Sequence, residues 1–230
     1  MNDQVVEAIV DQVMKRLAGN PAELSSDLNL VTDDIRAGRV MIGVSARHCH
    51  LSPEHVETLF GPGKKLTVFK PLLQPGEFAS EQTVTMVSPA GRCLGPVRVL
   101  GPERKTSQAE ISLTDCYALG LKELPPVRPS GDHRDSIGMT LVGPAGSVML
   151  KGGVIRANRH IHLHTSQSAA LGLKDNDVVD VLVPGERPTV LQGCQLRAHL
   201  NFRAEMHLDT DDANAAGIRS GEFVQILLKR

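Results

Sequence analysis

The chain has 230 residues, of which 41% are hydrophobic and 22% charged, and its formal net charge is -1. This composition is typical of a soluble globular protein with one large or two modest domains, and no apolar run approaches the ~20 residues of a membrane span. The charge shows no basic surplus and the chain has no Trp and one Tyr, so nucleic-acid binding is not expected. The four cysteines form no CxxC pair and the N-terminus shows no secretory pattern, which predicts a reducing cytoplasm.

The N-terminal segment is predicted to form an appended amphipathic helix. Apolar residues recur at helical spacing from 2 to 17, with charged residues opposite, and Gly19-Asn20-Pro21 ends the pattern. We therefore expect a helix within residues 1–20 and a polar linker over 21–39. The helix either docks on its own protein or offers its apolar stripe to a partner groove, and its acidic residues disfavour a membrane-surface role.

Two five-residue stretches, 47–51 and 159–163, share the pattern Arg-His-x-His-Leu. In a strand, residues two apart point to the same face of the sheet, so each stretch presents two imidazoles side by side. A single His-x-His more often marks solvated or hydrogen-bonded histidines than a ligand pair. The repetition with the same flanking Arg and Leu favours a metal site instead.

The two motifs are parts of a longer internal duplication. A capped short helix follows each motif, at 53–61 and 165–172, and Ala-Glu-Ile-Ser-Leu at 109–113 matches Ala-Glu-Met-His-Leu at 204–208. A proline-rich connector at 124–133 separates the halves, and short β-type runs with Gly/Pro turns fill the remainder. We predict a mainly β protein with two similar small β-barrel domains, 40–123 and 134–230, related by a pseudo-two-fold duplication.

Pairing of the halves would bring the four motif histidines together, which is too many for one open catalytic zinc and suits two metals. The downstream matched segments supply the remaining ligands. Glu205 is as well explained by a structural or supporting role as by ligation, His164 is expected in a supporting or surface position, and Cys49 as a buried thiol. The predicted ligand sets are His48, His50 and Glu110 for one zinc, and His160, His162 and His207 for the other.

The chain contains no Gly-x-Ser-x-Gly elbow and no phosphate-binding glycine loop, so covalent serine catalysis and nucleotide folds lose support. An arginine close in sequence to a metal ligand can hold phosphate, although a solvated surface charge is the better explanation for any single one of the cations near the turns of the first half, Lys70, Arg98, Arg104 and Lys105. On this basis a zinc hydrolase and a non-catalytic protein in which zinc only clamps the two halves both stay open.

The motifs resemble the PduL-type phosphate propanoyltransferases, the phosphotransacylases of bacterial microcompartments. The resemblance rests on the segments 47–52, 101–113, 159–163 and 204–210, and it covers the whole body of the chain. It implies two β-barrels with a dinuclear zinc site between them, holding the ligands named above, and an arginine, Arg104, that holds phosphate. The positions where it implies contact with coenzyme A are Ser45, Lys70, Arg98, Leu100, His207 and Asn214.

The resemblance also implies the reaction, which is reversible conversion of a short acyl-CoA and phosphate to acyl phosphate and coenzyme A. It implies that the N-terminal helix binds shell or core proteins and directs the enzyme into the microcompartment lumen within the cytoplasm. The preferred acyl chain, acetyl or propionyl, and the oligomeric state, a homo-oligomer included, are left open by the sequence.

Overall fold

The computed structural model describes residues 30–228, so the helix predicted within residues 1–20 lies outside the described part of the chain. The described chain begins with the short helix α3 (Asp33–Arg36), which falls inside the predicted polar linker. Thr32 caps it, because its side-chain oxygen accepts a hydrogen bond from the Ile35 amide. Ile35 is buried in the core of one barrel, so the end of the predicted linker is packed against the body.

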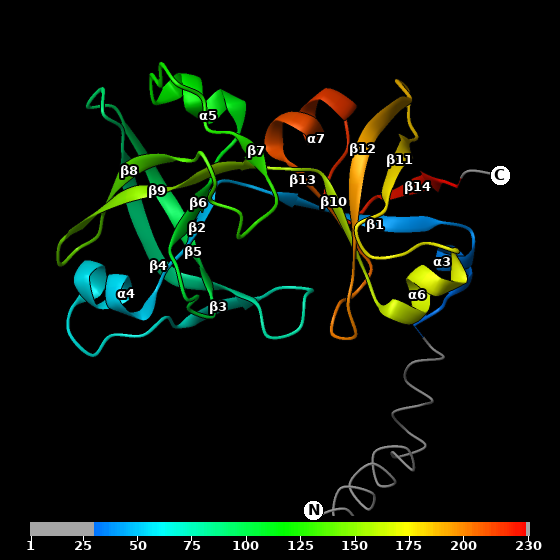
Figure 1. The fold of residues 1–230 in the computed structure, drawn as a ribbon, viewed down its shortest axis with the longest axis horizontal. Helices are drawn as coiled ribbons and strands as arrows, with labels where there is room; N and C mark the ends of the chain where they lie inside the picture. The colour runs from blue at the N-terminus through cyan, green and yellow to red at the C-terminus, as the bar shows by residue number, and fades with distance from the viewer. Residues whose placement is uncertain (1–29, 229–230) are drawn as a thin grey trace, which may run out of the picture.

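The fold is mainly β, as predicted, and consists of two closed barrels of six strands that lie side by side (Figure 1). In the first barrel the strand pairings close a ring in the order β4-β5-β2-β6-β9-β8. Two further strands, β3 (Val68–Pro71) and β7 (Val127–Arg128), pair with members of this ring. The ring strands are β2 (His48–His50), β4 (Phe78–Val87), β5 (Cys93–Gly101), β6 (Gln108–Glu110), β8 (Ile137–Val142) and β9 (Ser147–Ala157).

The second barrel closes in the order β1-β13-β10-β12-β11-β14. Its pairings repeat those of the first barrel, because β10 runs parallel to β12 and antiparallel to β13, as β2 does with β5 and β6. The predicted duplication is therefore present in the strand pairing. The strands of this barrel are β1 (Arg39–Ser45), β10 (His160–Leu163), β11 (Val178–Val183), β12 (Thr189–Ala198), β13 (Glu205–Asp209) and β14 (Phe223–Leu227).

The strand pairing crosses the predicted boundary at 124–133. Strand β1 precedes all strands of the first barrel but completes the second, where it lies parallel to β13. Strand β9 precedes β10 but completes the first barrel, where it lies parallel to β6. Strand β8 also lies after this boundary and belongs to the first barrel, between β9 and β4. Only when the chain is divided between β8 and β9 does each part lend its first strand to the barrel of the other part. Two residues then join β1 to β2 and β9 to β10, so both crossings lie beside the His-x-His segments.

Four short helices cover the ends of the barrels, and side chains cap each of them. Ser52 caps α4 (Pro53–Phe60) and Ser112 caps α5 (Leu113–Ala118). His164 caps α6 (Thr165–Ala170) and Asp209 caps α7 (Thr210–Ala216). These oxygen or nitrogen acceptors satisfy backbone amides that have no partner within the first turn of a helix.

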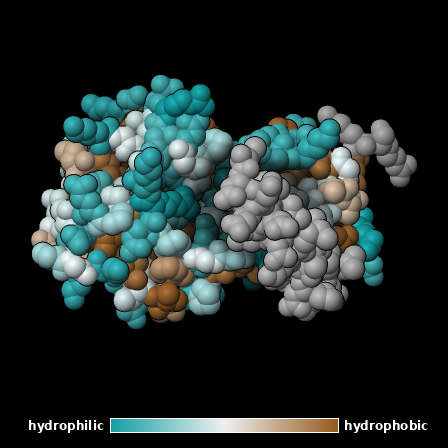
Figure 2. All heavy atoms as spheres, turned by 60° about the horizontal axis from the view of Figure 1, so that its bottom comes forward, coloured by the Kyte–Doolittle hydropathy of each residue, from teal (hydrophilic) through white to brown (hydrophobic). Residues whose placement is uncertain are grey.

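Each barrel has its own core, built mainly of aliphatic side chains. Along strands such as β11, β13 and β14, alternate residues enter this core, because side chains alternate across a strand. Figure 2 shows a largely hydrophilic face with separate apolar patches. No helix in residues 30–228 has the length and apolar character needed to cross a membrane.

Candidate metal centre

The first two histidines of each predicted ligand set come from β2 and β10, the short strands that follow the crossings. Cys49 and Ile161, the central residues of the His-x-His segments, are fully buried in the two barrel cores. Alternation then turns the flanking histidines to the opposite side, where both segments face a common space. Burial raises the pKa of the Cys49 thiol to about 12, so this cysteine is a protonated core residue, as predicted.

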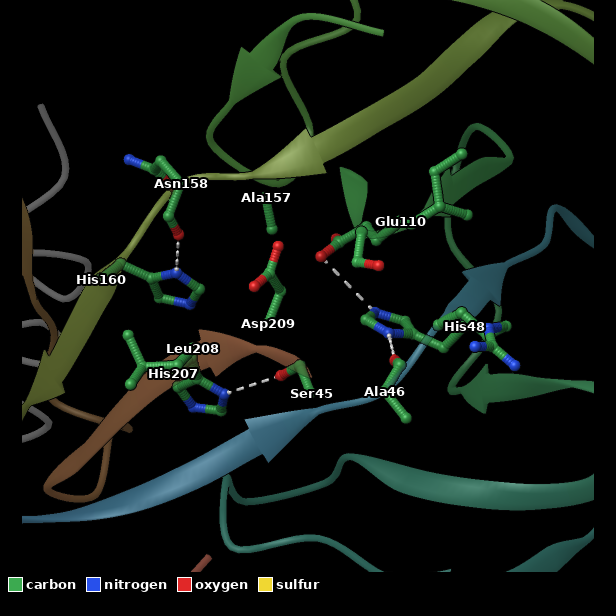
Figure 3. Close-up of a pocket in the computed structure, with 13 residues that line it drawn as sticks. Ser45, Ala46, His48, Glu110, Ala157, Asn158, His160, His207, Leu208 and Asp209 are labelled. Carbon is green, nitrogen blue, oxygen red and sulfur yellow. Dashed lines mark hydrogen bonds and ion pairs between the residues drawn. The ribbon is translucent and has the colours of Figure 1, made fainter. Parts of the chain in front are cut away.

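A backbone carbonyl fixes the first histidine of each pair. The Nδ1 atom of His48 lies 2.9 Å from the Ala46 carbonyl oxygen, and Nδ1 of His160 lies 2.9 Å from that of Asn158 (Figure 3). A carbonyl can only accept, so Nδ1 carries the hydrogen and Nε2 keeps its lone pair. Both carbonyls belong to the residues that join the crossing strands, and they orient Nε2 as supporting groups do for metal-bound histidines.

The third member of each set lies across the sheet from the first histidine. His48 pairs in register with Glu110 of β6, and His160 pairs with His207 of β13. Glu110 is therefore the counterpart of His207, and Gln108 that of Glu205. The sequence match of 109–113 with 204–208 is displaced by two residues from this structural register. Ser112, matched to His207 in sequence, instead caps α5 as Asp209 caps α7.

The structure groups the six predicted ligands as the sequence does. The ligand atoms of His48, His50 and Glu110 lie within 4.8 Å of one another, as do those of the second group. The second group is His160, His162 and His207. We call these groups the first and the second triad. Nitrogen and carboxylate ligands in threes suit zinc with an open position.

The second histidine of each triad has a buried nitrogen that needs a partner. Among the described residues, Nδ1 of His50 and Nδ1 of His162 are shielded from solvent and have no hydrogen-bond partner. Burial lowers the pKa of both imidazoles to about 2, with the positive charge of neighbouring groups adding to the effect. Both rings are thus neutral at pH 7, which is the form that binds metal, and a metal ion would satisfy the two nitrogens.

The first triad has a carboxylate held in its charged form. Burial would raise the pKa of Glu110, but His48, a hydrogen bond from Ser130 and Arg104 together lower it below its ordinary value. The His48 Nε2 atom lies 3.6 Å from Glu110 Oε2, and the Gln108 amide donates to Glu110 Oε1. The first triad therefore carries a negative charge that the second lacks.

Beside the second triad, Glu205 occupies the position that Gln108 has beside the first triad, and its side chain faces His207. Its Oε2 atom lies 3.1 Å from His207 Nε2 and accepts a hydrogen bond of 3.0 Å from Gln74. Glu205 is not part of either ligand group. His164 is buried at the start of α6, where its Nδ1 atom accepts from the Ser166 amide, and it also lies outside both groups.

The arginine that precedes each His-x-His segment forms an ion pair with a helix, Arg47 with α5 and Arg159 with α7. Arg47 Nη2 lies 2.7 Å from Asp115 Oδ1, and Arg159 donates two hydrogen bonds of 2.7 Å to the carboxylate of Asp212. Both acids occupy the third position of their helix, so the two ion pairs are related by the duplication. The repeated Arg of the motif is thus explained by support of the site.

Members of both triads line the same narrow space between the barrels. Figure 3 shows His48 and Glu110 on one side of this space, His160 and His207 on the other, and Asp209 between them. The space opens into a cleft of about 550 Å³ that contacts every member of both triads. Both triads can therefore be reached from the cleft, whereas the ligands of a closed structural metal site are shut off from solvent.

Several of the predicted substrate-binding residues line this cleft, namely Ser45, Arg98, Leu100, Arg104 and His207. Arg104 donates to Ser130 Oγ at 2.9 Å and lies 3.5 Å from Glu77. Lys70 is exposed on β3 and Asn214 is exposed on α7, and neither lines the cleft. Their predicted contact with coenzyme A stays a prediction.

Other residues of the cleft were not found from the sequence. They come from separate loops and from β12, and they share no motif that would mark them as neighbours. One of these residues, Arg197, could have been found from a spacing. Glu110 and His207 are 97 residues apart, and the same spacing applied to Leu100, a predicted contact of coenzyme A, leads to Arg197. The missed residues include Leu72, Leu73, Gln74, Glu77, Ser130, Arg197 and Phe202.

Comparison with known proteins matches residues 41–219 to the family model described as phosphate propanoyltransferase. A phosphate propanoyltransferase of Rhodopseudomonas palustris is 43% identical over 232 residues, covering 100% of this chain and 99% of the relative. One of Thermotoga maritima is 47% identical, covering 82% and 89%, and one of Lachnoclostridium phytofermentans is 48% identical, covering 82% and 87%. The chain therefore belongs to the phosphate propanoyltransferase family of acyltransferases, as the sequence motifs predicted.

Proposed function

We propose that this protein transfers a short acyl group, propionyl or acetyl, reversibly between coenzyme A and phosphate at a centre of two zinc ions. The observation that carries the proposal is that two triads of three ligands line one open cleft. Three protein ligands leave a free coordination position on a tetrahedral zinc, which a clamp with only structural metals would not need. The names of the relatives supply the reaction class.

The residues of both triads fit zinc. The buried, unpartnered Nδ1 atoms of His50 and His162 and the carbonyl-fixed rings of His48 and His160 leave one lone pair on each imidazole. When bound, zinc would supply Lewis-acid stabilisation of the departing thiolate and of the negative charge that develops on the thioester oxygen.

The chain's own groups would orient the two substrates. Arg104 is partly buried in the cleft, and its hydrogen bond to Ser130 fixes the guanidinium so that it can hold phosphate by two parallel hydrogen bonds. Leu72, Leu73 and Leu100 give the same cleft an apolar wall for the acyl and pantetheine parts. With both substrates held, phosphate can attack the thioester directly, and no acyl-enzyme is needed.

Release of free coenzyme A from propionyl-CoA, followed with a thiol reagent, tests this proposal. The assay compares metal-free and zinc-loaded protein, each with and without phosphate, and acyl phosphate is measured as the second product. We expect release only with both zinc and phosphate present. Equal release without phosphate would identify a zinc hydrolase, and no release from fully zinc-loaded protein would favour the clamp.

We further propose that residues 1–20 bind a shell or core protein and bring the enzyme into the lumen of a bacterial microcompartment. The support is the amphipathic pattern of residues 2–17 together with the family resemblance. A variant lacking residues 1–20 is expected to keep its turnover and to lose co-purification with the compartment. Unchanged co-purification would contradict the proposed role.

A further inference from the structure

Arg197 is a cation in the cleft that no sequence motif singles out. It lies on β12, where it pairs in register with His162 of the second triad, so both side chains are on the same face of the sheet. Its side chain is half-buried and lines the cleft. Within residues 30–228 no hydrogen bond or ion pair engages its guanidinium, and its one ring contact is with Phe202, whose centroid lies 6.0 Å from Cζ.

The carboxylates that line the cleft do not neutralise Arg197. Each of those in the described part of the chain already faces another group: Glu77 faces Arg104, Glu110 faces His48, and Glu205 faces His207. An arginine in a partly desolvated cleft without a counter-ion is suited to an anionic ligand.

The duplication shows that this charge is a departure from the symmetry of the two barrels. His48 pairs with Arg98 on β5, and His160 pairs with Gln195 on β12, so Arg98 corresponds to Gln195. Two residues further on, Leu100 corresponds to Arg197. The wall beside the first triad is therefore apolar at the position where the wall beside the second triad is cationic.

Phe202 holds Arg197 beside the second triad. Its ring centroid lies 4.3 Å from that of His162, and the guanidinium of Arg197 lies over the same ring. Arg104 enters the cleft from the first barrel, and its pKa is lowered mainly by burial, with the charge of Arg197 contributing. Two arginines from different barrels thus line one cleft, close enough for their charges to interact, and this arrangement suits a dianion held by both.

We propose that Arg197 binds the phosphoryl group of the reaction, inorganic phosphate in one direction and acyl phosphate in the other, opposite Arg104. The inference rests on the proposed function and adds a residue that selects the phosphate acceptor. The phosphates of coenzyme A share the same chemistry, so the experiment has to separate the two sources.

Arg197→Gln and Arg197→Lys are compared with the wild type, all zinc-loaded, in steady-state kinetics. Arg187→Gln, which removes an exposed charge from the same barrel away from the cleft, is the matched control. We expect Arg197→Gln to raise KM for inorganic phosphate and for acyl phosphate by ~10- to 100-fold, with KM for coenzyme A changed less than about twofold. Arg197→Lys is expected to recover part of the loss, and Arg187→Gln to behave as wild type.

A raised KM for coenzyme A with an unchanged KM for phosphate would overturn the proposal, as would wild-type kinetics for Arg197→Gln. Titration calorimetry of zinc-loaded protein with inorganic phosphate needs no turnover and gives an independent readout. Weaker phosphate binding by Arg197→Gln than by Arg187→Gln supports the site even if the coenzyme A release assay shows no acyl transfer. Equal phosphate binding by the two variants refutes it.

Discussion

The two barrels position their triads with the same kinds of contact, but the triads differ in their third residue and in the side chain beside it. In both, a carbonyl from the crossing residues fixes the first histidine, and the motif arginine binds an acid at the third position of a helix. The third ligand differs, because the first triad has Glu110 and the second has His207. The supporting neighbour differs too, being Gln108 beside Glu110 and Glu205 beside His207.

The contacts that position the triad residues are shared by the two barrels, whereas the residues that set the charge of each triad differ. The shared contacts orient ligands, which any site at this position needs. The differing residues change the charge, since a triad with a carboxylate and a triad of three imidazoles would make metals bound there unequal Lewis acids. We therefore expect the two sites to differ in affinity and role, although the strands that build them are equivalent.

The largest effect is expected from removal of the first histidine of either triad. His48→Ala and His160→Ala each delete a ligand, and if both metals take part in the reaction each variant should lose about a thousandfold or more in kcat/KM. Zinc content by mass spectrometry should fall by one ion per chain in each case. A variant that loses one zinc but keeps its full rate would assign that triad a structural role only.

The second-largest effect is expected from substitution of Gln108 and Glu205, the side chains next to Glu110 and His207. Gln108→Leu is expected to weaken zinc at the first triad and Glu205→Leu at the second, each by ~10- to 100-fold, because outer groups orient the ligands. Competition with a chelator measures both sites in one protein, so the untouched triad serves as the control. Equal weakening of both sites by one variant would show that the triads are coupled rather than independent.

The metal-free protein should lose stability in acid. Burial lowers the pKa of His50 and His162 to about 2, and that of His160 to about 4, from an ordinary value of 6.5. Between these values the unfolded chain binds more protons than the folded chain, so stability falls as the pH decreases below 6.5. The slope is at most ~1.4 kcal/mol per pH unit for each histidine.

Urea unfolding of metal-free protein at pH 7.5, 6.5 and 5.5 measures this dependence. His162→Gln removes one titrating group and should flatten the curve. An unchanged slope in that variant would mean that other groups control the acid response.

The smallest effects are expected at the motif arginines, and they should be unequal. Asp115 is 2% exposed and Asp212 is 26% exposed at the side chain, so loss of its arginine leaves Asp115 the more poorly solvated. We expect Arg47→Ala to cost about 1–3 kcal/mol of the free energy of unfolding and Arg159→Ala about 1 kcal/mol. Chemical denaturation of both variants measures the difference, and a reversed order would show that the bidentate geometry of Arg159 outweighs burial.

The sequence predicted the groups of the site that local patterns encode. His-x-His in a strand places two rings on one face, so His48 and His50, and likewise His160 and His162, can be paired from their spacing alone. Glu110 and His207 were predicted as the third ligands because they lie in the two similar segments 109–113 and 204–208. The match was nevertheless two residues out of register, because Ala-Glu and Leu recur in both segments at positions that the strands do not treat as equivalent.

The remaining features depend on contacts between distant parts of the chain. Nothing in residues 39–45 marks β1 as a member of the distant barrel, since any amphipathic strand pattern fits either partner. Arg197 and Phe202 gain their place only when β12 and the following loop fold beside the second triad. The proline-rich stretch at 124–133 has the composition of a domain boundary, yet its Ser130 and Gly131 bind Gln108 next to the first triad.

The exchange of β1 and β9 means that the two halves of this chain are not separable modules. A cut within 124–133 would leave the first barrel dependent on β8 and β9 of the C-terminal fragment and the second barrel dependent on β1 of the N-terminal fragment, so the fragments should stay interlocked. The arrangement is that of two copies of one strand-lending unit joined in a single polypeptide. Both passages between the barrels occur at the residues that support His48 and His160, so the segments that connect the two barrels also fix the geometry of the two triads.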